Sequence, residues 1–387
     1  MFCIRRLSYI FTIAGFLSIG VISFAIAADS SNLTSSPSSR LNKLYAISKL
    51  PIYQSSPTAK DTSGSSCGDS GLFNENLKEI DGPRDVARIG SIGDIAFDRD
   101  GNLFFTDEKY HTIRVLSVDG QVMKVAGQSG EYGCNDGKIE TAHLFNPYGI
   151  EVDKNNNIYF YDHHMIRKIE ADGSVSTLAG SSNVMGHLDG VGKQASFWGY
   201  QVKITMGLDG NLYVADQNTL RRVSPQGDVL TLVGNINSNE ILDGVGRDAK
   251  FISINSVQPD SVNNIYLLDA GVVRKVNDKN QVITLPVRDS NVDFCKPLSM
   301  ALGKNNLLYL GSFGSIRVFD HSGIELRSLV NEHVDCNTKE RRKNNKDLGI
   351  VSILKADSYG NLYGVNDLGL FQVLDSGEVK ILVRNVN

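Results

Sequence analysis

The chain has 387 residues, a formal net charge of −4 and 41% hydrophobic residues. The apolar content is enough to bury a core, and the length by itself would suit two domains. The slightly negative charge gives no basis for nucleic acid as a partner.

The first 28 residues have the features of a secretory signal peptide. Arg5 and Arg6 precede an uncharged run that ends in Ala25-Ile26-Ala27-Ala28. A positive start, an apolar stretch and a small-residue cleavage site are typical of such a signal. We expect cleavage after Ala27 or Ala28 and an exported protein, either periplasmic or secreted. The apolar run is also long enough for an uncleaved anchor, and only that alternative involves a membrane.

Residues 29–66 are rich in Ser, Thr and Pro, a composition typical of a flexible linker because it buries too little apolar surface to fold. Within it, Leu41 to Tyr53 is more apolar, and we expect this piece to dock weakly on the folded body. Its apolar members are Leu44, Tyr45, Ile47, Leu50 and Ile52. The folded domain is expected to span residues 67–387.

A short unit then recurs along the chain, best seen as Gly210-Asn211-Leu212-Tyr213-Val214-Ala215-Asp216. Its aromatic position falls at residues 104, 159, 213, 266, 309 and 363, with spacings of 55, 54, 53, 43 and 54 residues. The last two copies are degraded. A fixed period of this length, with alternating apolar residues and Asp-Gly or Asn-Asn turns, is typical of a β repeat.

Each period contains four short strands with turn residues between them. In the third copy the predicted strands are Val202 to Met206, Asn211 to Ala215, Leu220 to Val223 and Val229 to Val233. Four antiparallel strands repeated six times predict an all-β, six-bladed β-propeller. Both ends are expected to complete their own blades.

The details of the repeat resemble one family. Val175 to Gly180, then Asp189-Gly190-Val191-Gly192, then the Gly-Asn-Leu-Tyr-Val-Ala-Asp unit and an arginine-containing strand are similar to the NHL repeat. The resemblance covers about residues 81–383. It implies a propeller fold of the NHL type, used as a binding scaffold, with related propellers that are lyases or lactonases.

Two ends of the propeller differ in loop length. The turns between first and second strands and between third and fourth strands are short in every copy. The blade-to-blade connections are long and share the other end with the second-to-third turns. They are Gly127 to Pro147, Gly180 to Tyr200, Gly234 to Ile254, Val287 to Pro297 and Val330 to Ile350. A rigid scaffold with one elaborated rim usually binds through it, so the long-loop rim is the predicted binding surface.

Several rim residues are candidates for partner contact. Trp198 and Tyr200 belong to an aromatic stretch that differs from the corresponding stretch in the other copies of the repeat, which favours a contact with a partner. The alternative for Trp198 is that it fills a gap under the loop. His163 and His164 occupy a second-to-third turn, where adjacent side chains are expected to point apart. Arg341 and Arg342 lie in a basic run that either recruits an anionic partner or is a solvated loop.

Alternation along the innermost strands predicts a polar central channel. Its charged and amide residues are Asp94, Glu151, Lys203, Gln258 and Lys355. These charges either pair across the channel or stay hydrated. Two carboxylates opposed by two lysines are a poor cation site, and no histidine falls on an innermost strand, so no metal or cofactor is predicted.

Other recurrent residues are interpreted as structural. Asp107, Asp162, Asp216 and Asp269 are expected to accept hydrogen bonds from their own turns, and the third-strand arginines to pair on a wet surface. The Asp-Gly loops at Asp136, Asp189 and Asp243 lack calcium-loop spacing. They predict a tight or capped turn before a buried phenylalanine at Phe145, Phe197 and Phe251. No catalytic residue is assigned.

After signal removal four of the five cysteines remain, and export makes disulfides expected. Sequence permits three pairings. Positions in the repeat favour Cys67–Cys134 and Cys295–Cys336.

These patterns predict an exported, non-enzymatic scaffold that captures a protein or an envelope carbohydrate through its long-loop rim. The alternative is a lyase or lactonase acting at the rim end of the channel. The two differ in convergence, because an enzyme needs acid, base or metal ligands that point into one cavity.

Overall fold

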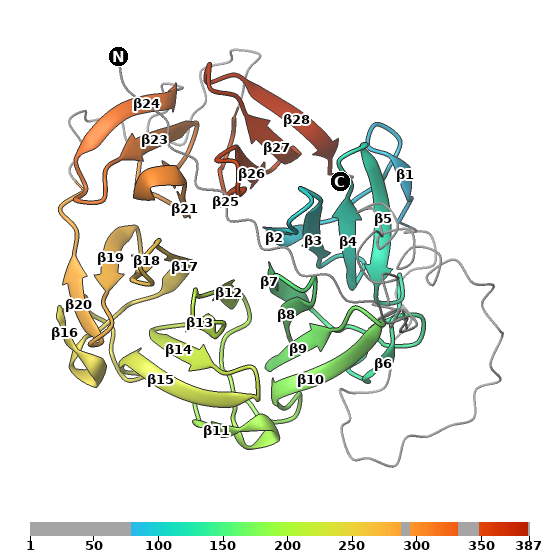
Figure 1. The fold of residues 1–387 in the computed structure, drawn as a ribbon, viewed down its shortest axis with the longest axis horizontal. Helices are drawn as coiled ribbons and strands as arrows, with labels where there is room; N and C mark the ends of the chain where they lie inside the picture. The colour runs from blue at the N-terminus through green and yellow to red at the C-terminus, as the bar shows by residue number, and fades with distance from the viewer. Residues whose placement is uncertain (1–78, 288–294, 332–347, 386–387) are drawn as a thin grey trace, which may run out of the picture.

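The computed structural model describes residues 79–287, 295–331 and 348–385, and these residues form a ring of six β-sheets (Figure 1). Each sheet is a blade, and consecutive strands along the chain are antiparallel neighbours within it. The predicted leader (residues 1–28) and linker (residues 29–66) lie outside the described residues. In the described part of the chain, no helix is long and apolar enough to cross a membrane.

The first four blades each contain five strands. Blade 1 has β1 (Gly82–Pro83), β2 (Ile92–Phe97), β3 (Leu103–Asp107), β4 (Thr112–Leu116) and β5 (Gln121–Ala126). Blade 2 has β6 (Gly137–Lys138), β7 (Pro147–Val152), β8 (Ile158–Asp162), β9 (Met165–Ile169) and β10 (Ser174–Gly180). Blade 3 has β11 (Gly190–Val191), β12 (Lys203–Met206), β13 (Leu212–Asp216), β14 (Thr219–Val223) and β15 (Asp228–Gly234). Blade 4 has β16 (Gly244–Val245), β17 (Ile254–Pro259), β18 (Ile265–Asp269), β19 (Val272–Val276) and β20 (Gln281–Thr284).

The last two blades contain four described strands each. Blade 5 has β21 (Ser299–Leu302), β22 (Leu308–Gly311), β23 (Ser315–Phe319) and β24 (Glu325–Asn331). Blade 6 has β25 (Ile353–Ala356), β26 (Leu362–Asn366), β27 (Gly369–Val373) and β28 (Val379–Arg384). Three short 3-10 helices complete the elements: η2 (Gly192–Gln194), η3 (Gly246–Asp248) and η4 (Lys304–Asn306).

The six-bladed prediction is confirmed, and the structure adds a strand to four of the blades. β1, β6, β11 and β16 each comprise two residues and pair with the outermost strand of the blade that follows them in the chain. Three of them begin at the glycine of a predicted Asp-Gly turn, as in Gly190, which pairs with Val229. The incoming connection therefore runs along the outer edge of its blade before it crosses to the centre.

The core lies between blades rather than in one central cluster. Apolar residues of neighbouring blades form each cluster; Phe197, Ile204 and Val214 of blade 3 pack with Tyr159 and Tyr161 of blade 2. Side chains alternate along each strand, so both faces of an inner strand are buried against neighbours.

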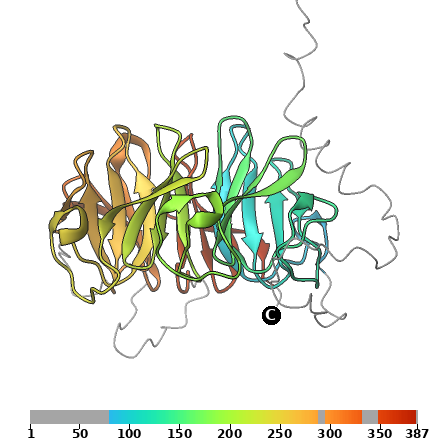
Figure 2. The ribbon, with the colours of Figure 1, turned by 90° about the horizontal axis from the view of Figure 1, so that it is seen from below.

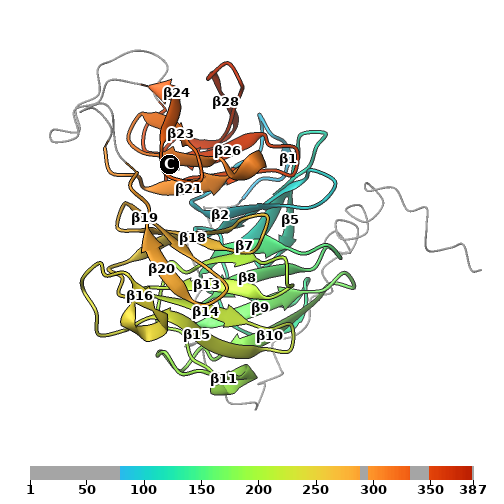
Figure 3. The same ribbon diagram turned by 60° about the vertical axis from the view of Figure 1, so that its left-hand side comes forward.

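The ring closes by packing of its first blade against its last. Ile89 forms a parallel bridge with Asn385, and Ile92 packs in one cluster with Ile353 and Val365. Figure 3 shows β2 beside the last blade. As predicted, both end blades are built from contiguous chain, because β28 belongs to blade 6 alone. Seen from the side, the ring is a disc whose strands run between two loop-bearing faces (Figure 2).

Candidate functional site

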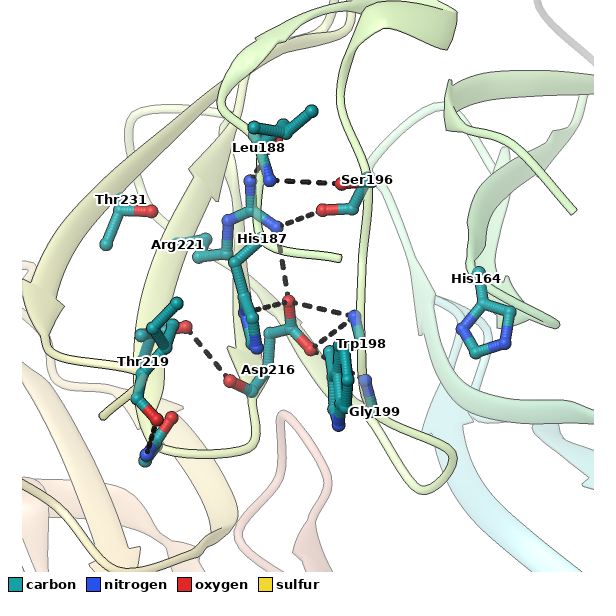
Figure 4. Close-up of polar contacts among 12 residues, drawn as sticks. His164, His187, Leu188, Ser196, Trp198, Gly199, Asp216, Thr219, Arg221 and Thr231 are labelled. Carbon is teal, nitrogen blue, oxygen red and sulfur yellow. Dashed lines mark hydrogen bonds and ion pairs between the residues drawn. The ribbon is translucent and has the colours of Figure 1, made fainter. Parts of the chain in front are cut away.

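A buried arginine fixes each long rim loop in blades 1 to 4, and blade 3 illustrates it (Figure 4). The Arg221 side chain is 0% exposed and donates through Nη1 to Oδ2 of Asp216 (3.1 Å) and to the Ser196 carbonyl (2.6 Å). Its Nη2 donates to the Leu188 carbonyl (2.6 Å) and to Oδ1 of Asp189 (3.0 Å). One guanidinium therefore joins two points of the incoming loop to the blade, an arrangement that we call the Asp–Arg bracket.

The same bracket recurs with Arg114, Arg167 and Arg274, which are also fully buried. The prediction that these arginines pair on a wet surface is therefore wrong. The recurrent aspartates also differ from expectation, because they accept backbone N–H groups from the incoming loop. Asp216, for example, accepts from Trp198 (3.1 Å) and Gly199 (2.9 Å). Both residue types position the rim.

The brackets correct the predicted alignment of the Asp-Gly loops. Phe197 and Phe251 are buried as expected, but Phe145 is only partly buried. The Phe145 N–H donates to Asp162, as the Trp198 N–H does to Asp216, so Phe145 is the counterpart of Trp198. Blade 2 uses Leu144 at the buried position instead.

Six aromatic and imidazole rings lie in a continuous row on the long-loop rim of blades 1 to 3. We call this row the aromatic band, and its members in order are His111, Tyr132, Phe145, His163, His164 and Tyr200. Neighbouring ring centroids are 5.7, 5.3, 4.1, 4.9 and 5.5 Å apart. The rings come from four separate loops, so the fold assembles the row and no single motif contains it.

His163 and His164 form the centre of the band because of an unusual backbone. They are the two residues of the β8–β9 turn, and both have positive φ, 46° and 67°. A two-residue hairpin turn with positive φ at both positions favours Asn-Gly over larger residues. The rings contact each other instead of pointing apart, which corrects the sequence expectation.

Trp198 lies in the same loop as Tyr200, beside the band. It is 39% exposed, and its ring stacks on His187 with centroids 5.7 Å apart and planes 11° apart (Figure 4). His187 Nδ1 lies 3.3 Å from Oδ2 of Asp216, so the stack rests on the Arg221 bracket. The exposed part of Trp198 faces solvent with a fixed support behind it.

The histidines of the band are biased toward the neutral form. Burial lowers the pKa of His111 and of His163. Burial also lowers the pKa of His164, and the neighbouring His163 adds to that shift. At neutral pH the band is therefore an uncharged aromatic surface.

Four of the six predicted rim residues lie together in the structure, and the other two are not among the described residues. Trp198 and Tyr200 are exposed, His163 is half-buried and His164 is buried, all on one side of the ring. Arg341 and Arg342 lie outside the described residues. Sequence reasoning missed His111, Tyr132, Phe145 and His187; the only available signal was their position in long connections and second-to-third turns.

The channel charges pair across the centre of the ring. Lys355 Nζ of blade 6 lies 3.0 Å from Oε2 of Glu151 in blade 2. Lys203 Nζ of blade 3 lies 3.4 Å from Oδ1 of Asp94 in blade 1, and it donates to the Gly93 carbonyl at 2.6 Å. Burial alone would lower the pKa of Lys355, but the carboxylates of Glu151 and Asp94 outweigh it and raise the pKa.

Little space remains inside the channel. The cavity lined by Asp94, Lys203, Gln258 and Lys355 has a volume of about 20 Å³. A single water molecule needs about 10–15 Å³ by this measure, so the cavity has room for water but not for a sugar or a peptide. A wider recess of about 330 Å³ opens at the short-turn end beside Glu151 and Lys355.

A polar cluster marks the long-loop mouth of the channel, and sequence reasoning missed it. Lys203 Nζ lies 4.5 Å from the centroid of the Tyr148 ring. A Cβ on Gly93 would lie 2.9 Å from Cδ2 of Tyr148 and 3.2 Å from Oε1 of Glu108, so these side chains converge around Gly93. Burial raises the pKa of Glu108 from 4.5 to about 7, although Lys203 opposes the shift.

Among residues 79–287, 295–331 and 348–385, no group of three or more His, Cys, Asp or Glu is close enough to hold a metal ion. Cys134 and Cys295 are buried. The pairings Cys67–Cys134 and Cys295–Cys336 stay predictions, because Cys67 and Cys336 lie outside the described residues.

Comparison with known proteins supports the same class of fold. The family model described as "Teneurin NHL domain" matches residues 129–197. Teneurin-3 of Danio rerio is 34% identical over 112 residues, and Teneurin-3 of Mus musculus is 26% identical over 251 residues. These matches cover 27% and 52% of this chain but only 4% and 9% of the relatives' lengths.

Among solved structures, a streptogramin B lyase superposes with a TM-score of 0.50 at 11% identity, covering 80% of this chain and 87% of that one. This likeness shows the fold alone. Six blades around a narrow channel, with an Asp–Arg bracket in four of them, define a six-bladed β-propeller. The repeat and the family match identify it further: the chain is an NHL-repeat β-propeller protein.

Proposed function

We propose that this chain is an exported, non-enzymatic scaffold that captures a protein through the aromatic band on its long-loop rim. The observation that carries the proposal is the continuity of six rings from four loops, with Tyr200 62% exposed at one end. Aromatic residues on a rigid support are the usual anchors of protein interfaces. The signal-peptide features of residues 1–28 support export.

A protein partner is favoured over an envelope carbohydrate by the residues beside the band. Met185 and Leu188 are exposed on the loop that carries Trp198 and Tyr200, and Met185 Sδ lies 4.0 Å from Oη of Tyr200. Aliphatic and thioether groups add contact area for apolar side chains and offer no hydrogen bonds to sugar hydroxyls. Carbohydrate binding is the second outcome that the experiment distinguishes.

The enzyme alternative is disfavoured by the way in which the channel carboxylates are used. Glu151 and Asp94 are each engaged by a lysine, and the cavity beside Asp94 holds about 20 Å³. The recess of about 330 Å³ beside Glu151 opens at the short-turn end, away from the rim end where this alternative places the reaction. A lactonase or lyase would need acid, base or metal ligands converging on a substrate-sized space. Elemental analysis of protein purified without added metal tests this directly. A stoichiometric metal would favour the enzyme, and we expect none.

The scaffold is tested with two tyrosine variants of equal exposure on opposite faces. Tyr200 is 62% exposed on the long-loop rim, and Tyr359 is 64% exposed in a short β25–β26 turn. Immobilised wild-type, Tyr200→Ala and Tyr359→Ala proteins are incubated with the native exported fraction and the retained proteins are compared. We expect one set of proteins that Tyr200→Ala loses at least tenfold and Tyr359→Ala retains.

Equal retention by the three proteins would contradict the proposal. A parallel glycan panel resolves the partner class: binding there that depends on Tyr200, without differential protein capture, would replace the protein partner by a carbohydrate. The two variants should have the same melting temperature, because both side chains are largely exposed.

A further inference from the structure

The aromatic band begins where the described chain begins. Glu79 is the first described residue, and its Oε2 accepts a hydrogen bond from Oγ1 of Thr112 at 3.1 Å. Thr112 directly follows His111, the first ring of the band. Glu79 is also held by Arg114 (3.8 Å) and Lys124 (3.5 Å). The chain that precedes Glu79 is therefore anchored beside one end of the band.

Between the predicted leader and Glu79, the most apolar segment is residues 41–53. It has four aliphatic residues after position 43, namely Leu44, Ile47, Leu50 and Ile52, together with Tyr45 and Tyr53. Contact with an aromatic surface removes the apolar area of such side chains from water and is therefore favourable. The surrounding Ser, Thr and Pro residues provide no comparable gain, so residues 41–53 are the part of this chain that an aromatic surface would retain.

The charges of segment and band are complementary. Residues 41–53 contain Lys43 and Lys49 and no acidic residue. The connection that carries Tyr132 and Phe145 contains Glu131, Asp136 and Glu140, and its single lysine, Lys138, pairs with Asp172 at 3.0 Å. The Glu131 side chain is 51% exposed beside the band.

The length of the intervening chain allows the contact. Twenty-five residues separate Tyr53 from Glu79. A chain of that length with the predicted linker composition spans about 25–30 Å. Neighbouring rings of the band are at most 5.7 Å apart, so all six are within that reach. Tethering at this range corresponds to an effective concentration of about 1 mM.

From this placement we infer that residues 41–53 dock on the aromatic band and cover it until a partner displaces them. The inference rests on the proposed function, because it names the intramolecular competitor for the same surface. Docking of an apolar, basic segment would also cover Tyr200, the one exposed ring of the band. An external partner must then bind more tightly than the tethered segment does.

Limited trypsin digestion of the full chain tests the docking. Lys43 and Lys49 lie in the segment, and Lys60 lies in the same linker outside it. We expect docking to slow cleavage at Lys43 and Lys49 about tenfold relative to the uncovered state; at an effective concentration of about 1 mM, that slowing corresponds to a dissociation constant of about 0.1 mM. Ile47→Asp supplies that uncovered reference, and Leu33→Asp is the matched control in the same linker.

We expect Ile47→Asp and Tyr200→Ala each to accelerate cleavage at Lys43 and Lys49 about tenfold and to leave cleavage at Lys60 unchanged. Leu33→Asp should behave as the wild type. Unchanged cleavage at Lys43 and Lys49 in both Ile47→Asp and Tyr200→Ala would overturn the inference.

Trp198 provides an independent readout because it is the sole tryptophan of the chain. Uncovering the band by Ile47→Asp should raise the acrylamide quenching constant of its fluorescence about twofold, and Leu33→Asp should not. The two proposals fail separately. Tyr200-dependent capture without protection of Lys43 and Lys49 overturns the docking alone, and protection without Tyr200-dependent capture overturns the proposed function alone.

Discussion

Glu108 and the His163–His164 turn are held in states that single residues do not favour. The Glu108 carboxyl is desolvated at the channel mouth, and both histidines have left-handed backbone. Such costs are retained where surrounding structure over-determines the residue, and they cluster at binding sites. Both lie on the long-loop face, which is consistent with a working surface there.

Glu108 makes stability fall as pH rises. Its pKa is raised from 4.5 to about 7 by burial, so between these values the folded protein keeps a proton that the unfolded chain releases. Glu108→Gln removes this pH-dependent contribution to the free energy of unfolding. We expect the variant to be more stable than the wild type by about 2 kcal/mol at pH 8 and by nearly nothing at pH 5. Urea unfolding at both pH values measures it; a difference independent of pH would contradict the assignment.

Replacing His163 and His164 by Asn and Gly should separate stability from binding. Left-handed backbone costs roughly 1–2 kcal/mol for an ordinary residue, and Asn-Gly adopts this turn readily. We expect the double variant to melt at a higher temperature, with about 1 kcal/mol gained, while partner capture through the band weakens. Unchanged capture would show that these rings do not contribute to the surface.

At the scale of elements, the Asp–Arg bracket fixes the incoming rim loop to its blade. Blade 6 shows what replaces it: Asn366 stands where the aspartate would be and Phe371 where the arginine would be, and both are buried. Asn366 Nδ2 donates to the Leu348 carbonyl at 2.6 Å, so the loop is still held. The change of both partners together fits the high cost of one buried charge left alone.

The Asn–Phe pair of blade 6 can be introduced into blade 3 to test the Asp–Arg bracket. Asp216→Asn alone removes the fully buried one of the two carboxylates that Arg221 contacts, leaves only the partly exposed Asp189, and should lower the free energy of unfolding by about 3–5 kcal/mol. Adding Arg221→Phe, as in blade 6, should recover at least half of that loss. Chemical denaturation of the two variants measures the difference. A double variant no more stable than Asp216→Asn alone would mean that the pair is not an interchangeable unit.

Elements were predicted from sequence where the periodic signal was strong. Alternation and turn residues gave all four strands of blade 3 to within one or two residues, for example β12 at Lys203–Met206. The two-residue outer strands were missed because pairs such as Gly137–Lys138 show no alternation. The alignment of Phe145 slipped by one residue because the connection before it differs in length. The aromatic band was missed because its six rings come from loops far apart in sequence.

At the scale of the whole molecule, the Asp–Arg brackets hold the rim loops and the lysine–carboxylate pairs link blades across the centre. Lys203–Asp94 links blades 3 and 1, and Lys355–Glu151 links blades 6 and 2, each across the channel. Each of the three blades whose rim carries the band therefore takes part in a contact across the channel. A closed centre and an aromatic rim together describe a rigid ring that presents one surface.

Site-specific photo-crosslinking tests the central claim most directly. A benzophenone amino acid is placed at Tyr200 or, as the matched control, at Tyr359, and the full chain is irradiated in the cells that produce it. The account predicts discrete protein adducts from position 200 and none from position 359. Adducts from position 359 with none from position 200 would place the partner on the short-turn face and contradict the account.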